Sequence, residues 1–149
     1  MNDIAKIRQQ LRAVDDPTAL LEGVFARAPT AIQIFRADGQ CLLVNSAFRE
    51  LFGSEPPPKY NILCDELAAK LGVLGPIRRA LAGETVVVGP TWRDPREGSQ
   101  ARVAEGKRVA IEVVAFPLVD AAGSVAHVAL TFKDVTTEMQ LRAEHGSSS

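Results

Sequence analysis

The fold is decided by one stretch of sequence, residues 31–53, which reads AIQIFRADGQCLLVNSAFRELFG. Residues 31–36 and 40–44 are short runs rich in residues that favour β-strands. The residues between them, 37–39, read Ala-Asp-Gly, which is typical of a tight turn. The stretch therefore begins with a predicted β-hairpin.

The second half of this stretch predicts a capped helix. Asn45 or Ser46 can accept hydrogen bonds from the free N–H groups of a first helical turn. Gly53 supplies the left-handed residue that commonly ends a helix. Its apolar face would consist of Phe48, Leu51 and Phe52.

Weaker helical signals follow a loop with three consecutive prolines at residues 54–60. We expect helices near residues 65–71 and 76–82, with Gly75 and Gly83 as the cap residues of the second. Strands are expected at residues 85–88, 107–118 and 124–133. Two strands separated from three by helices predict an α+β fold, a five-stranded antiparallel sheet with short helices on one face. The other face is left for the amino-terminal helices.

The amino terminus predicts two helices. Ile4, Ile7, Leu11 and Val14 recur at helical spacing, and such a short apolar stripe needs a partner, either the domain's own sheet or a second subunit. We take these four residues as dimerisation candidates. Asp16-Pro17 is typical of a cap and a first helical residue. The expected division is residues 1–21 for this element, 22–137 for the domain and 138–149 for an exit helix and tail.

Composition narrows the class of protein. The 149 residues are 46% hydrophobic and 23% charged, which suits a globular domain, and the net charge of −1 argues against a nucleic-acid surface. We see neither a membrane-spanning run nor a secretory leader, so we expect a cytoplasmic segment without membrane contact. Cys41 and Cys64 show no metal or disulfide spacing and are interpreted as core residues.

Three segments together resemble the PAS family. They are Asp38-Gly39-Gln40 with the following Leu43–Gly53 segment, then Phe116–Asp120 with Gly123, and finally Asp134-Val135-Thr136. The resemblance covers about residues 22–137. It implies a sheet that cups a small pocket, frequent dimerisation, and fusion to an effector such as a histidine kinase, a cyclic-dinucleotide enzyme or a transcription regulator.

Strand alternation predicts which residues face that pocket. Glu112 should face water, which turns Val109, Ile111, Val113 and Ala115 toward the helices. The resemblance implies inward Gln33, Phe35 and Phe132, and an inward Gln33 needs a hydrogen-bond partner that a ligand could supply. Ile32 and Ile34 would then meet the amino-terminal helices. The candidate pocket residues are Gln33, Phe35, Phe48, Phe52, Leu67, Ile77, Leu81, Trp92, Ile111, Val113, Val128, Leu130 and Phe132; the alternative is that this set is simply core.

Cofactor and catalytic interpretations find little support. No histidine precedes His127, which should face outward, so haem is disfavoured. The motif of photoactive flavin domains is matched only faintly by residues 61–65, so a flavin is disfavoured too. Asp65 and Glu66 are adjacent, and successive helical residues do not share a face. We therefore expect no enzyme activity and leave the cofactor unassigned.

The expected function is that of a sensory and signal-relay module. It would bind a small apolar molecule or a partner and act on an effector, a kinase of a two-component system or a regulator, through its terminal helices. Asp134 and Thr136 stand where the last strand meets the exit helix and are the candidate relay residues. Two alternatives remain open: a ligand-free interaction and dimerisation domain, and a small enzyme on a similar cupped sheet.

Overall fold

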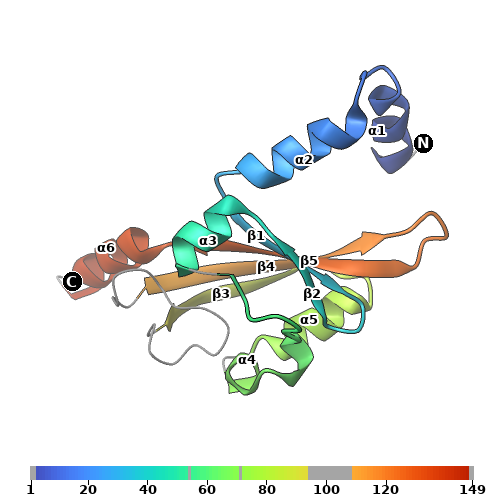
Figure 1. The fold of residues 1–149 in the computed structure, drawn as a ribbon. Helices are drawn as coiled ribbons and strands as arrows, with labels where there is room; N and C mark the ends of the chain where they lie inside the picture. Colours follow the sequence, from blue (N-terminus) through green and yellow to red (C-terminus); the bar gives the residue numbers. More distant parts are fainter. Residues whose placement is uncertain (1–2, 54, 71, 94–108, 148–149) are drawn as a thin grey trace.

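The computed structural model describes residues 3–53, 55–70, 72–93 and 109–147. Its strands form one antiparallel sheet of five, in the order β2-β1-β5-β4-β3, which confirms the α+β prediction (Figure 1). In the part of the chain described, no helix is both long and apolar enough to cross a membrane. The elements are α1 (Asp3–Leu11), α2 (Pro17–Arg27), β1 (Ala31–Arg36), β2 (Cys41–Val44), α3 (Ser46–Phe52), the 3₁₀ helix η1 (Ile62–Cys64), α4 (Glu66–Lys70), α5 (Leu74–Leu81), β3 (Val86–Arg93), β4 (Val109–Val119), β5 (Val125–Asp134) and α6 (Thr136–Ser147).

The first hairpin forms where the sequence predicts it. The Asp38 side chain accepts a hydrogen bond from the backbone N–H of Gln40 at 3.0 Å, and Gly39 has φ of 92°. A β-carbon at Gly39 would lie 2.4 Å from Oδ1 of Asn61, so only glycine fits this turn. The turn is therefore set both by its own residues and by the segment packed against it.

The following helix, α3, also has the predicted caps. Asn45 rather than Ser46 provides the cap, since its Oδ1 accepts from the N–H of Phe48 at 3.1 Å. Gly53 ends the helix with φ of 80°. Phe48 and Phe52 are buried, so α3 lays its apolar face on the core.

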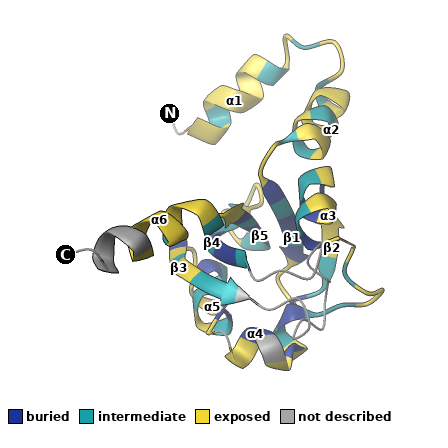
Figure 2. Cartoon of the chain, turned by 90° about the vertical axis from the view of Figure 1, so that its left-hand side faces the viewer, coloured by how far each residue is buried: buried dark blue, intermediate teal, exposed yellow. Residues whose placement is uncertain are grey.

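One face of the sheet carries that core. The buried residues of β1 alternate, as do those of β4 from Ile111 to Ala115, whereas Val128, Ala129 and Leu130 of β5 are all buried. Helices α3 and α5 contact the inner face. Figure 2 shows buried residues concentrated in the sheet, whereas α1, α2 and α6 are mostly exposed. The main buried apolar residues are Phe35, Phe48, Phe52, Ile62, Ile77, Ile111, Val113, Val128, Leu130 and Phe132.

The third strand is longer than the sequence suggests. It runs over Val86–Arg93, whereas we expected strand residues only at 85–88. The pairing with β4 shifts between Val88 and Thr91. Since β3 lies at the sheet edge, a proline without an N–H is tolerated there.

Two helical expectations were wrong. Gly75 is not a cap, because α5 already begins at Leu74. The amino-terminal helix ends at Leu11, so Val14 lies beyond it and the stripe is not one continuous helix. Gly83, in contrast, has φ of 104° directly after the end of α5, as its expected cap role requires.

The amino-terminal helices do not cover the outer face of the sheet, contrary to our expectation. Helix α2 has no buried residue and packs against α3 at its carboxyl end, and in Figure 1 both α1 and α2 stand away from the sheet. Ile32 and Ile34 on the outer face stay half-exposed. Helix α2 is thus anchored only at its carboxyl end. Its exposed apolar side chains and the half-exposed outer face of the sheet stay separate.

Cys64 is not a core residue. It ends the 3₁₀ helix and is exposed, while Ile62 takes the buried position of that turn. Cys41 is half-buried on β2.

Candidate ligand chamber and helix junctions

Gln33 is the most unusual polar residue of the core. It lies in the middle of β1, faces the helices as expected, and is 0% exposed. Its Nε2 lies 3.5 Å from Sγ of Cys41, while its Oε1 has no hydrogen-bond partner among the described residues. An unsatisfied buried amide oxygen costs about 1–3 kcal/mol, so this position is poorly suited to a purely structural core.

Apolar side chains of β5 surround this amide. Gln33 pairs with Leu130, and Phe35 pairs with Val128; all three apolar residues are buried. Cys41, opposite Phe35 on β2, completes the group. Burial raises the pKa of the Cys41 thiol, which keeps it protonated, and its Sγ accepts the hydrogen bond from Nε2 of Gln33. Sequence reasoning missed Cys41 as a partner, because the register of the predicted hairpin shifts between Ile34 and Phe35, and that register decides which β2 residue reaches Gln33.

Three phenylalanines of the predicted pocket pack on one another instead of leaving space. The ring centroids of Phe48 and Phe52 are 4.6 Å apart, and those of Phe52 and Phe132 are 5.2 Å apart in an edge-to-face arrangement. Phe48 and Phe132 are also in edge contact at 5.6 Å. This end of the core is filled by its own side chains.

The other pocket candidates divide into three groups. Ile77, Ile111 and Val113 are buried in the same core, and Leu81 is half-buried beside it. The side chain of Leu67 lies outside the described residues. Trp92 pairs with Ala110. Ala110 and Ile111 are neighbours in β4 and point to opposite faces, so Trp92 lies on the outer face of the sheet and not beside Gln33. The tryptophan was misplaced because β3 continues past Pro90.

Asn45 joins three elements. Its Oδ1 accepts from the N–H groups of Phe48 and Ile32, at 3.1 and 3.0 Å. Its Nδ2 donates to the carbonyls of Phe25 and Thr30, at 3.1 and 2.9 Å. The residue is 1% exposed, so α2, β1 and α3 meet on one buried amide. The sequence predicted the cap alone, because the other three partners are tertiary.

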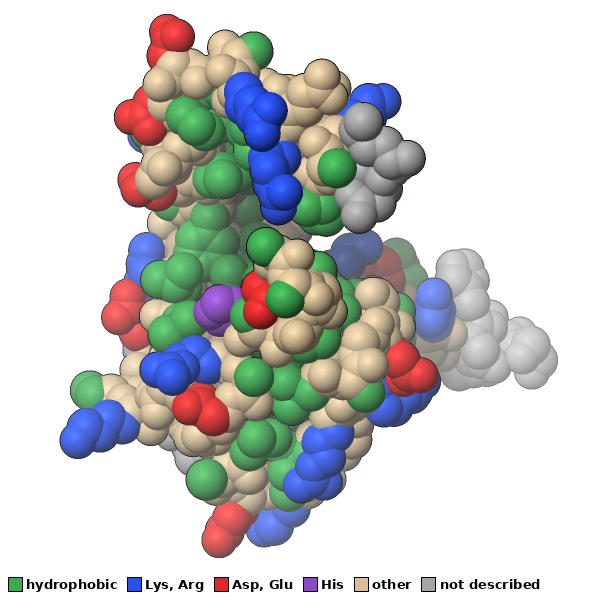
Figure 3. All heavy atoms as spheres, turned by 90° about the vertical axis from the view of Figure 1, so that its right-hand side faces the viewer, with side chains coloured by type: hydrophobic (Ala, Val, Ile, Leu, Met, Phe, Trp, Pro, Cys, Tyr) green, Lys and Arg blue, Asp and Glu red, His purple; other side chains and the backbone are tan. Residues whose placement is uncertain are grey.

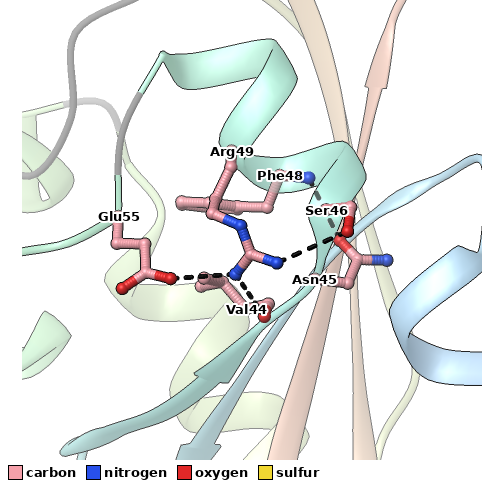
Figure 4. A network of polar contacts seen from close by, with 6 residues as sticks. All are labelled: Val44, Asn45, Ser46, Phe48, Arg49 and Glu55. Carbon is pink, nitrogen blue, oxygen red and sulfur yellow. Dashed lines mark hydrogen bonds and ion pairs between the residues drawn. The ribbon is translucent and has the colours of Figure 1, made fainter. Parts of the chain in front are cut away.

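A surface network lies beside this amide, as Figure 4 shows. Arg49 forms an ion pair with Glu55 at 2.8 Å and also reaches the carbonyl of Val44 at 3.4 Å. It ties the end of β2 to the start of the loop after α3. Because both charged side chains are largely exposed, the pair adds little stability.

Asp134 and Thr136 connect the exit helix to the sheet. The carboxylate of Asp134 accepts from the backbone N–H of Thr136 at 2.9 Å and from its hydroxyl. The Thr136 Oγ1 in turn accepts from the N–H of Ala110 at 3.0 Å, and Val135 donates to the carbonyl of Ala110 at 2.8 Å. The expected local bonds are present, and they extend to β4, which the sequence did not indicate. Their relay role stays a prediction.

No group of three or more His, Cys, Asp and Glu side chains that could hold a metal ion occurs among the described residues. His127 is half-buried on β5, opposite Leu118, and so faces outward as predicted. His145 lies in α6, and its side chain is outside the described residues.

Comparison with solved structures gives the same fold. A phage VqmA in complex with DPO superposes with a TM-score of 0.56 and 22% identity, over 98% of this chain and 60% of that one. A Vibrio cholerae VqmA dimer in the absence of target DNA gives 0.60 and 15%, over 81% and 52%. A domain of a sensory box sensor histidine kinase/response regulator from Geobacter sulfurreducens gives 0.55 and 16%, over 83% and 99%.

The chain thus spans about half to three fifths of the two VqmA proteins. None of the curated proteins matches it at a significant level. A family model described as PAS fold matches residues 25–140, which is most of the chain. The hairpin, the asparagine-capped helix and the closing Asp-Val-Thr segment all fall within that match, and the chain belongs to the PAS-fold family.

Proposed function

We propose that this chain is the sensing part of a signalling protein, and that it binds a small, mostly apolar molecule next to Gln33. The observation that carries the proposal is the fully buried amide with Cys41 at one end and no partner among the described residues at the other. A polar group of a ligand would satisfy that end and remove a cost of about 1–3 kcal/mol. A filled, ligand-independent core gains nothing from a glutamine here.

The surroundings define the class of ligand. Phe35, Val128 and Leu130 form apolar walls beside the amide, so one polar group on an otherwise apolar molecule suits the site. The oxygen and nitrogen of an amide are told apart only by their hydrogen bonds, so the ligand group is either a donor or an acceptor. Ile77, Leu81, Ile111 and Val113 are proposed as more distant walls.

The test is native mass spectrometry of the purified chain, combined with its absorption spectrum. We expect an additional bound mass in the wild-type chain and its loss in Gln33→Met, which has nearly the same shape without the amide. Gln140→Met, on the exposed side of α6, is the matched control and should keep the bound mass. A wild-type chain that carries no bound mass would remove the ligand from this proposal.

Urea denaturation separates the two interpretations of Gln33. If no ligand is bound beside Gln33, Gln33→Met should raise the free energy of unfolding by about 1 kcal/mol, since it removes an unsatisfied amide. If a ligand is bound, the same variant should lower it, because the ligand's stabilisation is lost.

A second candidate function is interaction without a ligand. Leu20, Leu21 and Val24 on α2 are 45%, 54% and 62% exposed, and this apolar ridge suits contact with another protein surface. We propose self-association through the amino-terminal helices, to which Ile4, Ile7 and Leu11 contribute; Val14 follows them in a turn. Sedimentation velocity of the full chain over a range of concentrations tests it, and a monomer throughout would contradict it.

The effector is proposed to be either a kinase or a transcription regulator. The Geobacter sulfurreducens relative supports the first, and the Vibrio cholerae VqmA relative, described with a DNA target, supports the second. Our expectation that this chain does not bind nucleic acid concerns its own net charge of −1 and stays a prediction. A cytoplasmic location belongs to the same proposal.

A further inference from the structure

A cleft of about 650 Å³ lies outside the core, between α3, the α2–β1 linker and the outer face of β4 and β5. Leu51 and Val114 provide apolar lining, and the charged lining residues are Glu50, Glu112, Lys133 and Asp134. Lys133 lies directly opposite Glu112 in the β4–β5 pairing, so these two charges offset each other. The cleft is therefore apolar inside with an acidic rim at Glu50 and Asp134.

Glu50 is free to act as a docking charge. It is exposed on α3 and forms no ion pair among the residues described. Asp134 already accepts two hydrogen bonds from Thr136, yet its negative charge remains at the rim. A ligand or partner that fits must combine apolar groups with positive charge.

Helix α1 has those properties. Ile4 and Ile7 are 55% and 48% exposed and share one stripe of the helix. Arg8 lies one turn after Ile4, at the edge of this stripe, and forms no ion pair among the described residues. Lys6 and Arg12 add positive charge nearby. The apolar stripe of α1 suits the apolar lining of the cleft, and the positive charge of Arg8 is opposite in sign to the acidic rim.

In this structure helix α1 does not lie at the cleft of its own chain. The cleft adjoins Pro29 and Thr30, directly after the carboxyl end of α2, whereas α1 lies beyond the opposite end (Figure 1). Eleven residues of α2 separate the two by roughly 16 Å. In Figure 3 the amino-terminal helices form a separate upper body above the rest of the chain.

A second copy of the chain would bring its own α1 helix to the cleft. If the α2 helices of two copies lie antiparallel about a twofold axis, each α1 comes to the end of the other copy's α2, where the cleft is. The exposed ridge of Leu20, Leu21 and Val24 then supplies the contact between the two α2 helices. A twofold arrangement fills both clefts with the same contact, as closed dimers require.

We propose that the acidic cleft receives α1 of a second copy of this chain, with Ile4 and Ile7 against Leu51 and Val114 and Arg8 beside Glu50. The inference rests on the proposed self-association and names the surface that it uses. The docked helix would also lie next to Asp134, at the junction of the sheet with the exit helix. A helix bound in the cleft would therefore lie beside the residues that are proposed to pass the signal to the effector.

The test is a charge exchange in the full chain, measured by sedimentation velocity with circular dichroism as the check on folding. We expect Arg8→Glu and Glu50→Arg each to raise the dimer dissociation constant about fivefold or more, since each turns an attraction into a repulsion. The two substitutions together should restore it to within about twofold. Arg8→Glu with Glu66→Arg, a charge on the distant helix α4, is the control and should stay weak.

The outcomes distinguish the two proposals. A wild-type chain that sediments as a monomer overturns both self-association and docking. A dimer with unchanged affinity in Arg8→Glu and in Glu50→Arg leaves self-association standing and overturns the docking site. Weakening without recovery in the exchanged pair, or equal recovery with Glu66→Arg, likewise overturns the docking site.

Discussion

Asn45 is the single side chain on which most of the local architecture depends. Its amide makes four hydrogen bonds, all of them to backbone groups of α2, the α2–β1 linker, β1 and α3. Aspartate at this position would keep the cap but lose both donors. The residue therefore does more than end a strand and start a helix.

Removal of this amide should destabilise the chain strongly. We expect Asn45→Ala to lower the free energy of unfolding by about 2–4 kcal/mol, because it removes a cap and leaves buried N–H and C=O groups without partners. Ser46→Ala, at the exposed neighbouring residue, should change it by less than about 0.5 kcal/mol. Urea denaturation of both variants measures the difference, and equal effects would show that the amide's tertiary bonds contribute nothing.

The two cysteines should respond differently to pH and to thiol reagents. Burial raises the pKa of Cys41, so its contribution to stability is complete at neutral pH and is lost as the pH rises through the alkaline range. Cys64 is exposed and should be modified first by a disulfide reagent at pH 8, with Cys41 much slower. Cys41→Ser should remove the slow phase alone; a single fast phase for both thiols in the wild type would contradict this assignment.

At the scale of the elements, the chain shows how the same residue type has opposite roles in different settings. Gly39 stands in a hairpin turn with positive φ and close contact to Asn61, whereas Gly75 stands in the first turn of α5 with open space around it. The conformational freedom of glycine is needed at the first and is a cost at the second.

Alanine substitution should therefore have opposite signs at these two glycines. Gly39→Ala is expected to destabilise the chain by about 1–3 kcal/mol through strain and the clash with Asn61. Gly75→Ala should stabilise it by about 0.5–1 kcal/mol through helix propensity. Thermal denaturation compares them directly, and a stabilising Gly39→Ala would mean that the turn is not held in this conformation.

At the scale of the whole molecule, α2 and α6 are each fastened at one end by a few polar bonds, and most of their described residues are exposed. Asn45 holds the end of α2, while Asp134 and Thr136 hold the start of α6 against β4. Weak, localised attachments of this kind can be shifted by a modest change in the sheet. This arrangement supports the proposal that the helices transmit the signal.

Loss of the Thr136 hydroxyl should loosen α6 without unfolding the domain. Thr136→Val keeps the shape of the side chain but leaves the N–H of Ala110 without its acceptor, and we expect a loss of about 1 kcal/mol. Hydrogen exchange should rise in α6 and at Ala110, while the β1–β2 hairpin stays protected. Thr137→Val, at the exposed next residue, is the control, and equal exchange in both variants would argue against a fastening role for Thr136.

Local signals were sufficient where neighbours along the chain form the structure. The hairpin at Gly39, the Asn45 cap, the Gly53 end and the alternation around Glu112 could all be predicted, because turns, caps and pleats depend on residues a few positions apart. They determined the α+β class, whereas the inward direction of Gln33 was implied by the family resemblance. Neither β3 beyond Pro90 nor the exposure of Cys64 was accessible in this way.

Only the tertiary structure decided which groups meet across elements. The register of β1 with β2, which shifts between Ile34 and Phe35, brings Cys41 to Gln33. The core leaves the other end of that amide without a partner among the described residues. The fold likewise gathers α2, β1 and α3 on Asn45 and places α1 far from the acidic cleft. By itself the sequence determined the five strands and the inward face of β4, because these follow from local propensity and period. The site and the unpartnered surfaces arise from contacts between residues distant in the chain, which no local pattern encodes.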